Sequence, residues 1–584
     1  MKIHTHPHAG ITAPVTISPD RFASIIAAAR ARKQAADLLS PAPDKTLEAV
    51  VADKIDVVQS MDDLRAAENM SVTDKYGHEI TYNDKQQEFI TLATSHQSCI
   101  LIGPAGTGKT TAMKGTVASL IHSSQTKILQ NHDHKHLPHG VPGIVVCAYT
   151  RRATNNIRRN MDEGMKGNCV TIHKLLEYQP EYTEVLDANG ESKTTMRFAP
   201  SRCAMNPLPH EITTIIFEES SMIGTALYTE VIAALPDPTN VQIIFLGDIQ
   251  QLPPVFGSAI LGFKMLELPL VELTEVYRQA LESPIIRLAH RILSGKVIPS
   301  AELASWNVPG QLKITPWKKK IEAEAALQVS EKLFSKLYDD GAYAPENDII
   351  LIPFNKSYGT LELNKSIANN ISRKHNRVVW EVVSGFIKHY FSVGDKVLYD
   401  REDAIIVDIW PSPTYTGAPA QRESTYLDYW GHSNKPSDIQ ESNDKGSTEE
   451  DIDFLLAQVA ASDEDRVTQS SHQIKLLMLD SDTEKTITKA AEVNALILGY
   501  ALTVHKSQGS EWDKVFLLFH NSHATMMQRE LLYTAVTRAK KELFIICEQD
   551  TFVNAVKGQR IKGNTLAEKA IYFQGKADRA EQQS

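Results

Sequence analysis

The sequence predicts an α/β protein with two parallel-sheet domains. Short apolar runs alternate with stretches of helical periodicity, and these runs fall into two groups. The first group is SCILIG, GIVVCAY, TTIIF and VQIIFLG, and the second is NDIILI, KVFLLF and ELFIIC. Wholly apolar runs of this length are typical of parallel strands whose two faces are covered by helices. A chain of 584 residues is long enough for two such domains and for further insertions.

The composition limits the classes of function. Lys and Arg number 61 against 71 Asp and Glu, a net charge of −10, so the chain is not a polycation that coats nucleic acid. A nucleic-acid site must therefore be a local basic channel. The five cysteines form no CxxC pair, which argues against a zinc finger and against a disulfide scaffold. Because the sequence shows no signal peptide and no apolar run of membrane-spanning length, we expect a cytoplasmic protein.

Three segments do not follow the strand–helix alternation. Residues 1–78 are interpreted as an N-terminal helical extension. Residues 177–207 contain a predicted β-hairpin with its tip at Asn189–Gly190, a pair typical of tight hairpin turns. Residues 386–490 open with the β-like stretch FSVGDKVLYD, and their acidic block at 437–466 is interpreted as a solvated loop.

The run after the first predicted strand is a phosphate-binding loop. GPAGTGKT matches GxxxxGK[ST], follows an apolar run and precedes a helical stretch, which is the context that the motif requires. Its backbone N–H groups can wrap phosphates, Lys109 can reach the β- and γ-phosphates, and the Thr110 hydroxyl can hold Mg²⁺. The predicted nucleotide-binding residues of this loop are Gly103, Pro104, Ala105, Gly106, Thr107, Gly108, Lys109, Thr110 and Thr111.

Two carboxylates follow a later predicted strand. Glu218 and Glu219 come directly after the run TTIIF. In P-loop nucleotide hydrolases, one carboxylate holds the metal ion and another group orients or polarises the attacking water. By position we assign the metal role to Glu218 and the base role to Glu219.

The order of motifs resembles the superfamily 1 helicases, and specifically their RecD/Dda-like branch. The resemblance covers roughly residues 80–560, and its last two motifs are long and highly specific. The motifs are YNDKQ (82–86), CAYTRRA (147–153), TIHKL (171–175), FEESSM (217–222), LGDIQQLPPV (246–255), LTEVYRQ (273–279), YALTVHKSQGSEWD (500–513) and LYTAVTRA (532–539).

The resemblance implies a fold with two RecA-like parallel-sheet P-loop motor domains. The first would span 79–270, with the hairpin insertion, and the second would combine 271–385 with 491–560. A small SH3-like β-barrel would be inserted at 386–490, and 561–584 would be a C-terminal tail.

The resemblance also implies roles for single residues. Arg278 and Arg538 would reach the γ-phosphate from the second domain, and Gln251 would connect the γ-phosphate to the DNA track. Further implied nucleotide contacts are Gln86, Gly509 and Glu511. The implied DNA-contacting residues are Tyr149, Thr150, Arg151, Thr171, His173, Thr503 and His505, and Arg152 would add positive charge beside them.

By this resemblance the chain is a monomeric DNA helicase that uses ATP and Mg²⁺ and moves 5′→3′ on single-stranded DNA. It would act in replication, recombination or repair, as compact bacteriophage helicases do. Its substrates would be single strands and duplex junctions, and its partners could include single-strand-binding or replication proteins. The hairpin would be a strand-separating pin. Two alternatives stay open: an RNA-directed helicase, because phosphate contacts do not identify the sugar, and a nucleotide-binding scaffold with impaired hydrolysis, because Glu218 stands where relatives usually have Asp.

Three smaller features have two interpretations each. Tyr149 stands where relatives usually have proline, and it either stacks on a base or packs on its own domain. Trp512 is interpreted as a core anchor more readily than as a base-stacking residue. The histidines of NHDHKHLPHG could bind a metal ion, but a polar loop is the simpler interpretation.

Overall fold

The computed structural model describes residues 81–122, 126–186, 192–254, 257–275, 282–317, 322–354, 359–384, 387–399, 402–413, 469–479 and 482–581. The predicted N-terminal extension, the acidic block, the hairpin tip Asn189–Gly190 and Arg278 lie outside these residues. Within the described ranges, no helix is both long enough and apolar enough to cross a membrane.

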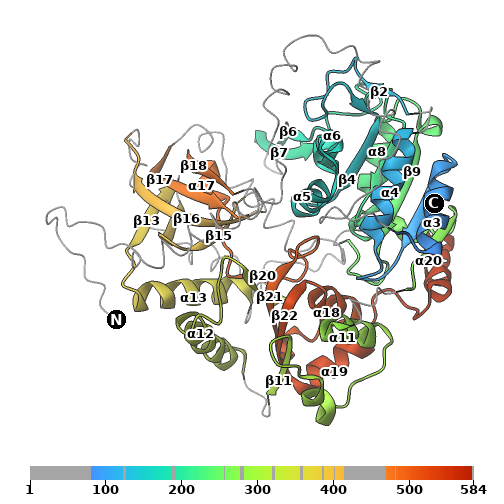
Figure 1. Cartoon of the computed structure of the whole chain (residues 1–584). Coiled ribbons are helices and arrows are strands. Elements are labelled where there is room, and N and C mark those ends of the chain that lie inside the picture. Colours follow the sequence, from blue (N-terminus) through green and yellow to red (C-terminus); the bar gives the residue numbers. More distant parts are fainter. Residues whose placement is uncertain are drawn as a thin grey trace.

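The first α/β domain is built on six parallel strands in the order β10-β1-β9-β8-β4-β5 (Figure 1). These strands are β1 (Cys99–Ile102), β4 (Ile144–Ala148), β5 (Cys169–Thr171), β8 (Thr214–Phe217), β9 (Gln242–Gly247) and β10 (Leu270–Glu272). The helices of this domain are α3 (Asp84–Thr94), α4 (Lys109–His122), α5 (Arg151–Asn160), α6 (Glu163–Lys166), α7 (Ile172–Leu175), α8 (Thr225–Ala234) and α9 (Ile260–Lys264). The short strands β2 (Ile128–Leu129) and β3 (Val141–Pro142) pair separately.

Neighbouring residues of each strand point to opposite faces of the sheet, which explains why the runs are apolar throughout. In β9, Ile243 and Phe245 pack into the core on one face, whereas Ile244 and Leu246 pack into the core on the other. Because both faces are covered, polar functional groups collect where the strands end.

The second α/β domain has five parallel strands in the order β11-β22-β21-β12-β20. These strands are β11 (Leu312–Trp317), β12 (Asp348–Ile352), β20 (Ala501–Thr503), β21 (Trp512–Phe519) and β22 (Ala539–Glu548). Its helices are α11 (Pro284–Leu293), α12 (Ala323–Asp339), α13 (Thr360–Lys374), α18 (Arg529–Val536) and α19 (Gln549–Lys557). Every predicted apolar run thus forms a strand, and the predicted α/β class with two parallel sheets is confirmed.

The predicted hairpin is also present. β6 (Gln179–Leu186) and β7 (Ser192–Ala199) pair antiparallel in register, Leu186 opposite Ser192. The hairpin extends from the first α/β domain between α7 and β8.

The described residues between 379 and 498 form a mainly β-stranded unit that is inserted into the second α/β domain, and we call it the inserted β unit. Its elements are β13 (Val379–Ser384), β14 (Ile387–Ser392), β15 (Lys396–Tyr399), β16 (Glu402–Pro411), β17 (Gln469–Met478), β18 (Thr483–Lys489), α17 (Ala490–Asn494) and β19 (Ile497–Leu498). It has its own apolar core. The described strands do not confirm a barrel, because β18-β17-β16-β15-β19 is an open order and β13–β14 is a separate hairpin. The unit extends beyond 386–490 on both sides, because β13 and β19 belong to it.

The C-terminal segment returns to the first α/β domain. Helix α20 (Leu566–Glu581) packs on α9. Figure 1 shows α20 at the right of the molecule, below α3 of the first domain. The ring of Phe573 is 2% exposed and lies against Gly262, where an added Cβ would come within 2.1 Å of it. The expected tail is therefore largely a docked helix that connects the end of the second domain to the first.

Candidate active site

The phosphate-binding loop connects β1 to α4. Gly106 and Gly108 adopt φ values of 82° and 83°, a left-handed conformation that glycine tolerates best. The Lys109 ammonium donates to the carbonyl oxygens of Gly103 (2.6 Å) and Pro104 (3.2 Å), so it lies across the loop. The free N–H groups at the start of α4 make the loop a site for anionic groups.

The two predicted carboxylates lie beside this loop. Glu218 follows β8, and its N–H donates to the carbonyl of Cys147 (2.8 Å). Glu219 adopts φ 51° and ψ 41°, a left-handed conformation that is uncommon for a non-glycine residue. Desolvation and the Glu219 charge raise the pKa of Glu218 to about 8, while Lys109 and Arg538 lower it. These opposing effects show that Glu218 lies close to charged groups of both α/β domains.

Three buried polar atoms at the end of the first sheet lack a hydrogen-bond partner among the described residues. They are Glu219 Oε2, Ser221 Oγ and Gln251 Oε1. Gln251 is 4% exposed and sits in the turn after β9. Buried polar groups in proteins are nearly always satisfied, so these atoms indicate a polar ligand or water at this position.

The second α/β domain contributes Arg538, which follows α18. Its Nε donates to Thr534 O (2.9 Å) and its Nη1 to Ser510 O (3.1 Å). The side chain is 4% exposed. Glu511, which follows Ser510, is exposed, and its charge also raises the pKa of Glu218. The charges of Lys109 and Arg538 thus both act on Glu218, whereas Arg278 lies outside the described residues.

Gln86 touches the phosphate-binding loop directly. Its Nε2 donates to the carbonyl of Gly108 (3.2 Å), and its Oε1 accepts from the N–H of Asn83 (3.1 Å). Asn83 in turn caps α3. The residue is fully buried, so in this conformation its amide positions the loop against α3.

The predicted DNA-contacting residues of the first domain lie at the ends of β4 and β5. The hydroxyls of Thr150 and Thr171 accept from the third amides of α5 (3.1 Å) and α7 (3.2 Å). The rings of Tyr149 and His173 meet edge to face with centroids 5.6 Å apart. Both rings are half-buried, so Tyr149 packs on its own domain and keeps part of its surface exposed.

The second domain completes this row of residues. Thr503 is buried at the end of β20 and His505 is half-buried after it, while Arg151 is exposed on the first domain. Gly509 has φ +73°, and an added Cβ would come within 2.7 Å of Thr150 Oγ1. The two α/β domains therefore meet at the predicted DNA track.

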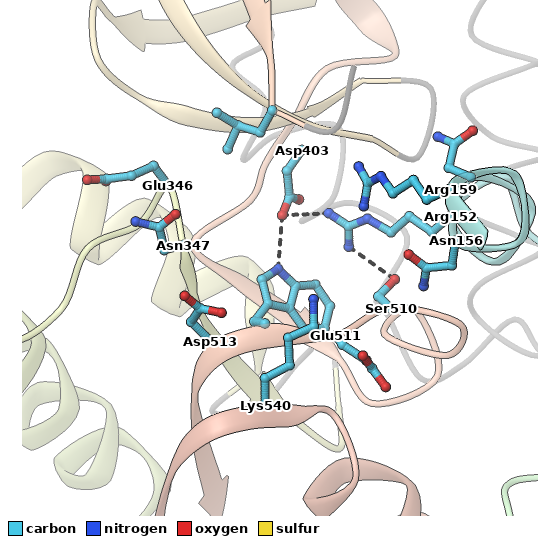
Figure 2. A pocket seen from close by; sticks show the side chains of 13 residues that line it. Arg152, Asn156, Arg159, Glu346, Asn347, Asp403, Ser510, Glu511, Asp513 and Lys540 are labelled. Carbon is cyan, nitrogen blue, oxygen red and sulfur yellow. Dashed lines mark hydrogen bonds and ion pairs between the residues drawn. The ribbon is translucent and has the colours of Figure 1, made fainter. Parts of the chain in front are cut away.

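The sequence interpretation expected Arg152 to add positive charge beside this track. In the structure its guanidinium is paired with an acidic residue. Its Nη2 pairs with Asp403 Oδ2 (2.5 Å), and its guanidinium lies over the ring of Trp512 at 4.8 Å. Figure 2 shows Arg152 pointing toward Asp403 and Ser510. Its Nη1 donates to Ser510 Oγ (3.2 Å), and the Trp512 indole N–H donates to Asp403 (3.1 Å). Trp512 is 6% exposed, so the predicted core anchor is confirmed.

This junction joins both α/β domains to the inserted β unit and borders a cavity of about 350 Å³. Asp403, on β16, carries no motif and was missed from the sequence. Its partner Arg152 precedes it by roughly 250 residues, so only the fold reveals the pair.

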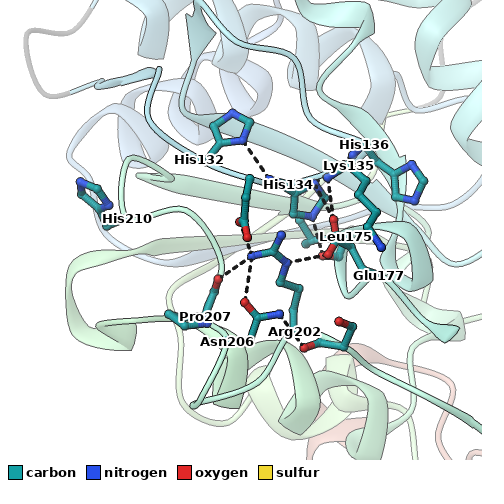
Figure 3. A network of polar contacts seen from close by, with 12 residues as sticks. His132, His134, Lys135, His136, Leu175, Glu177, Arg202, Asn206, Pro207 and His210 are labelled. Atoms are coloured by element: carbon teal, nitrogen blue, oxygen red, sulfur yellow. Dashed lines mark hydrogen bonds and ion pairs between the residues drawn. The ribbon is translucent and has the colours of Figure 1, made fainter. Parts of the chain in front are cut away.

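The histidine-rich loop is part of a polar network (Figure 3). His134 is buried and its Nε2 contacts the carbonyl oxygen of Leu175 (2.8 Å). Arg202 pairs with Glu177 (2.8 Å) and Asp133 (2.9 Å). In the part of the chain that the structure describes, no group of three or more His, Cys, Asp or Glu is arranged to hold a metal ion.

Comparison with known proteins matches the two α/β domains separately. Residues 81–313 match the family described as an AAA domain, and residues 498–546 match the UvrD-like helicase C-terminal domain. Among solved structures, the Pif1 helicase from Candida albicans is similar to this chain at 15% sequence identity and a TM-score of 0.43. The match covers 85% of this chain and 100% of the Pif1 chain.

Curated relatives extend the similarity over most of the chain. The ATP-dependent RecD2 DNA helicase of Deinococcus radiodurans is 26% identical over 483 residues, which is 83% of this chain. The RecBCD enzyme subunit RecD of Buchnera aphidicola is 23% identical over 503 residues, 81% of this chain and 74% of the relative. The chain spans about half (51%) of the RecD2 protein's length. With the motif order and the matched domains, these relatives show that the chain is similar to the RecD-like superfamily 1B helicases over most of its length.

Proposed function

We propose that this chain is an ATP-driven DNA helicase that moves 5′→3′ on single-stranded DNA and unwinds duplexes. The observation that carries the proposal is a nucleotide site to which both α/β domains contribute. Lys109 and Glu218 come from the first domain. Arg538 of the second acts on the Glu218 charge, and Thr534, one turn before it, accepts from the N–H of Leu252 in the first domain (3.0 Å). The RecD2 relative is named an ATP-dependent DNA helicase, and the direction follows from the family resemblance.

The residues at the site fit a nucleotide with Mg²⁺. The unpartnered oxygens of Glu219 and Gln251 need polar partners beside the phosphate-binding loop. Thr110 and Glu218 would hold Mg²⁺, which supplies positive charge to the phosphate oxygens. Glu219 would orient the attacking water, and Lys109 would exchange its loop carbonyls for phosphate oxygens.

Nucleotide-driven motion follows from contacts on both sides of the cleft. A triphosphate that touches Lys109 and Arg538 together favours the closed arrangement of the two domains, because it binds both faces only there. After hydrolysis fewer phosphate contacts join the domains, and the cleft relaxes. Arg538 suits this role because its guanidinium stays charged and can bind two oxygens at once.

The DNA track would cross the same two domains. Thr150 at the start of α5 and Thr503 after β20 offer hydroxyls, and Arg151 offers an exposed positive charge, all suited to a phosphate backbone. Because Gly509 approaches Thr150 across the domain boundary, cleft motion changes the spacing of phosphate contacts. The β6–β7 hairpin would separate the strands at the junction.

The test is ATP hydrolysis by the full chain with equal lengths of single-stranded DNA and RNA. We expect DNA to stimulate turnover more than RNA, and Lys109→Ala to abolish the stimulation. Greater stimulation by RNA would support the RNA-directed alternative. Turnover that neither polymer stimulates, or that Lys109→Ala leaves unchanged, would contradict the proposed function.

A further inference from the structure

A buried tyrosine of the second α/β domain forms hydrogen bonds with the nucleotide site of the first. Tyr533 lies on α18, in the same short motif as Arg538, and its side chain is fully buried. Its hydroxyl accepts from the backbone N–H of Ala105 in the phosphate-binding loop (2.8 Å). The same hydroxyl donates to Asp248 Oδ2 (2.7 Å). One phenol oxygen therefore links two elements of the first domain to a helix of the second.

Asp248 is well placed to fix the direction of these hydrogen bonds. It is fully buried directly after β9, and its Oδ1 accepts from the N–H of Gln250 (2.9 Å) in the turn that carries Gln251. Burial and the neighbouring Asp248 raise the pKa of Tyr533 well above its ordinary value, so the phenol keeps its proton. A protonated phenol beside a carboxylate donates to it, which leaves the phenol oxygen free to accept from the loop.

The next residue of α18 makes a second contact of this kind. Thr534 Oγ1 accepts from the N–H of Leu252 (3.0 Å), which follows Gln251. The carbonyl of Thr534 also accepts from Arg538 Nε (2.9 Å). The same turn of α18 therefore touches the phosphate-binding loop and the Gln251 turn, and holds the guanidinium that faces the nucleotide site.

We propose that Tyr533 is a positioning residue for ATP hydrolysis. Its hydroxyl sets the position of α18 on the phosphate-binding loop, and so the reach of Arg538 to the phosphates. This inference rests on the proposed function, because it assumes that the site hydrolyses ATP. Tyr533 acts through Arg538 and the loop and does not itself bind the nucleotide.

Tyr533→Phe removes only the hydroxyl and keeps the ring in the core. The chain offers a matched control in Tyr343, also fully buried in the second domain, whose hydroxyl donates to the carbonyl of Tyr500 (3.2 Å). Tyr343 packs in the core on the other face of the second sheet. Tyr343→Phe therefore reports the cost of losing a buried hydroxyl far from the nucleotide site.

The experiment measures kcat and KM for ATP with saturating single-stranded DNA, together with the urea midpoint of unfolding, for the full-length wild type and both variants. We expect Tyr533→Phe to lower kcat roughly 10- to 100-fold, which is the effect if the strength of one hydrogen bond to a charged group is lost from the transition state, with KM within about twofold. We expect Tyr343→Phe to keep kcat within about twofold of the wild type.

Two results would overturn the inference: an unchanged kcat in Tyr533→Phe, or an equal loss of kcat in Tyr343→Phe. The urea midpoints show that each variant is folded under the assay conditions. Failure of the proposed function would give a different result. In that case the wild type would show no ATP hydrolysis that depends on Lys109.

Discussion

Replacing Asp403 by asparagine is expected to loosen the inserted β unit from both α/β domains. The Asp403 carboxylate holds Arg152 of the first domain at 2.5 Å and accepts from the Trp512 indole of the second at 3.1 Å. It also pairs with the buried Lys396 of its own unit at 3.2 Å. Loss of its negative charge would remove the carboxylate that pairs with Arg152 and with the fully buried Lys396.

The pKa of Asp403 gives the size of this effect. Burial acts to raise it, but the Arg152 and Lys396 charges outweigh burial and lower it to about 2 from the usual 3.8. A difference of nearly two pH units corresponds to about 2–3 kcal/mol at neutral pH. Because the folded-state pKa is lowered, this contribution is present above pH 4 and is lost as the pH falls toward 2. At pH 3 about half of it should remain.

Hydrogen–deuterium exchange of the β15 and β16 amides measures this contribution locally, which suits a protein with several domains. We expect Asp403→Asn to lower the opening free energy of these strands by about 2–3 kcal/mol at pH 7, and the difference from the wild type to shrink at pH 3. Asp408→Asn is the matched control, because Asp408 lies exposed on the same strand. A difference below about 0.5 kcal/mol, or one that does not change with pH, would refute the reasoning.

Three further predictions concern other parts of the molecule. Arg538→Ala should keep nucleotide binding but lower turnover by about 10³-fold or more, measured by fluorescent-nucleotide titration and steady-state ATPase, and wild-type-like turnover would contradict its assigned role. Deletion of residues 185–196 should spare DNA-stimulated ATPase and impair duplex opening, so undiminished unwinding would count against a strand-separating hairpin. Phe573→Ala should release α20 from Gly262 and destabilise its docking by about 3–5 kcal/mol, seen as faster amide exchange in 566–581 with no change in the second sheet; unchanged exchange would disprove that contact.

Strands and the phosphate-binding loop could be predicted because their signals are local. A run such as VQIIFLG must be buried on both faces, and β9 is buried on both faces. The loop motif likewise needs only its own glycines and Lys109. The pair Glu218–Glu219 could be placed because it directly follows a predicted strand.

Contacts between domains could not be predicted, because the residues that surround each contacting side chain in the sequence do not indicate which distant residue it will meet. Arg152 was expected to add positive charge beside the DNA track, and only the folded chain brings Asp403 to it. The hydroxyl of Tyr533 and the return of α20 to the first domain are of the same kind. The expected barrel stays unconfirmed, since alternating apolar residues indicate a strand but do not fix which strands close a sheet.

The most direct test of the central claim is an unwinding assay with duplexes that carry either a 5′ or a 3′ single-stranded tail. The account predicts ATP-dependent strand separation from the 5′-tailed substrate by the wild-type chain and none by Lys109→Ala. Unwinding that proceeds without ATP, that favours the 3′ tail, or that survives Lys109→Ala would contradict it.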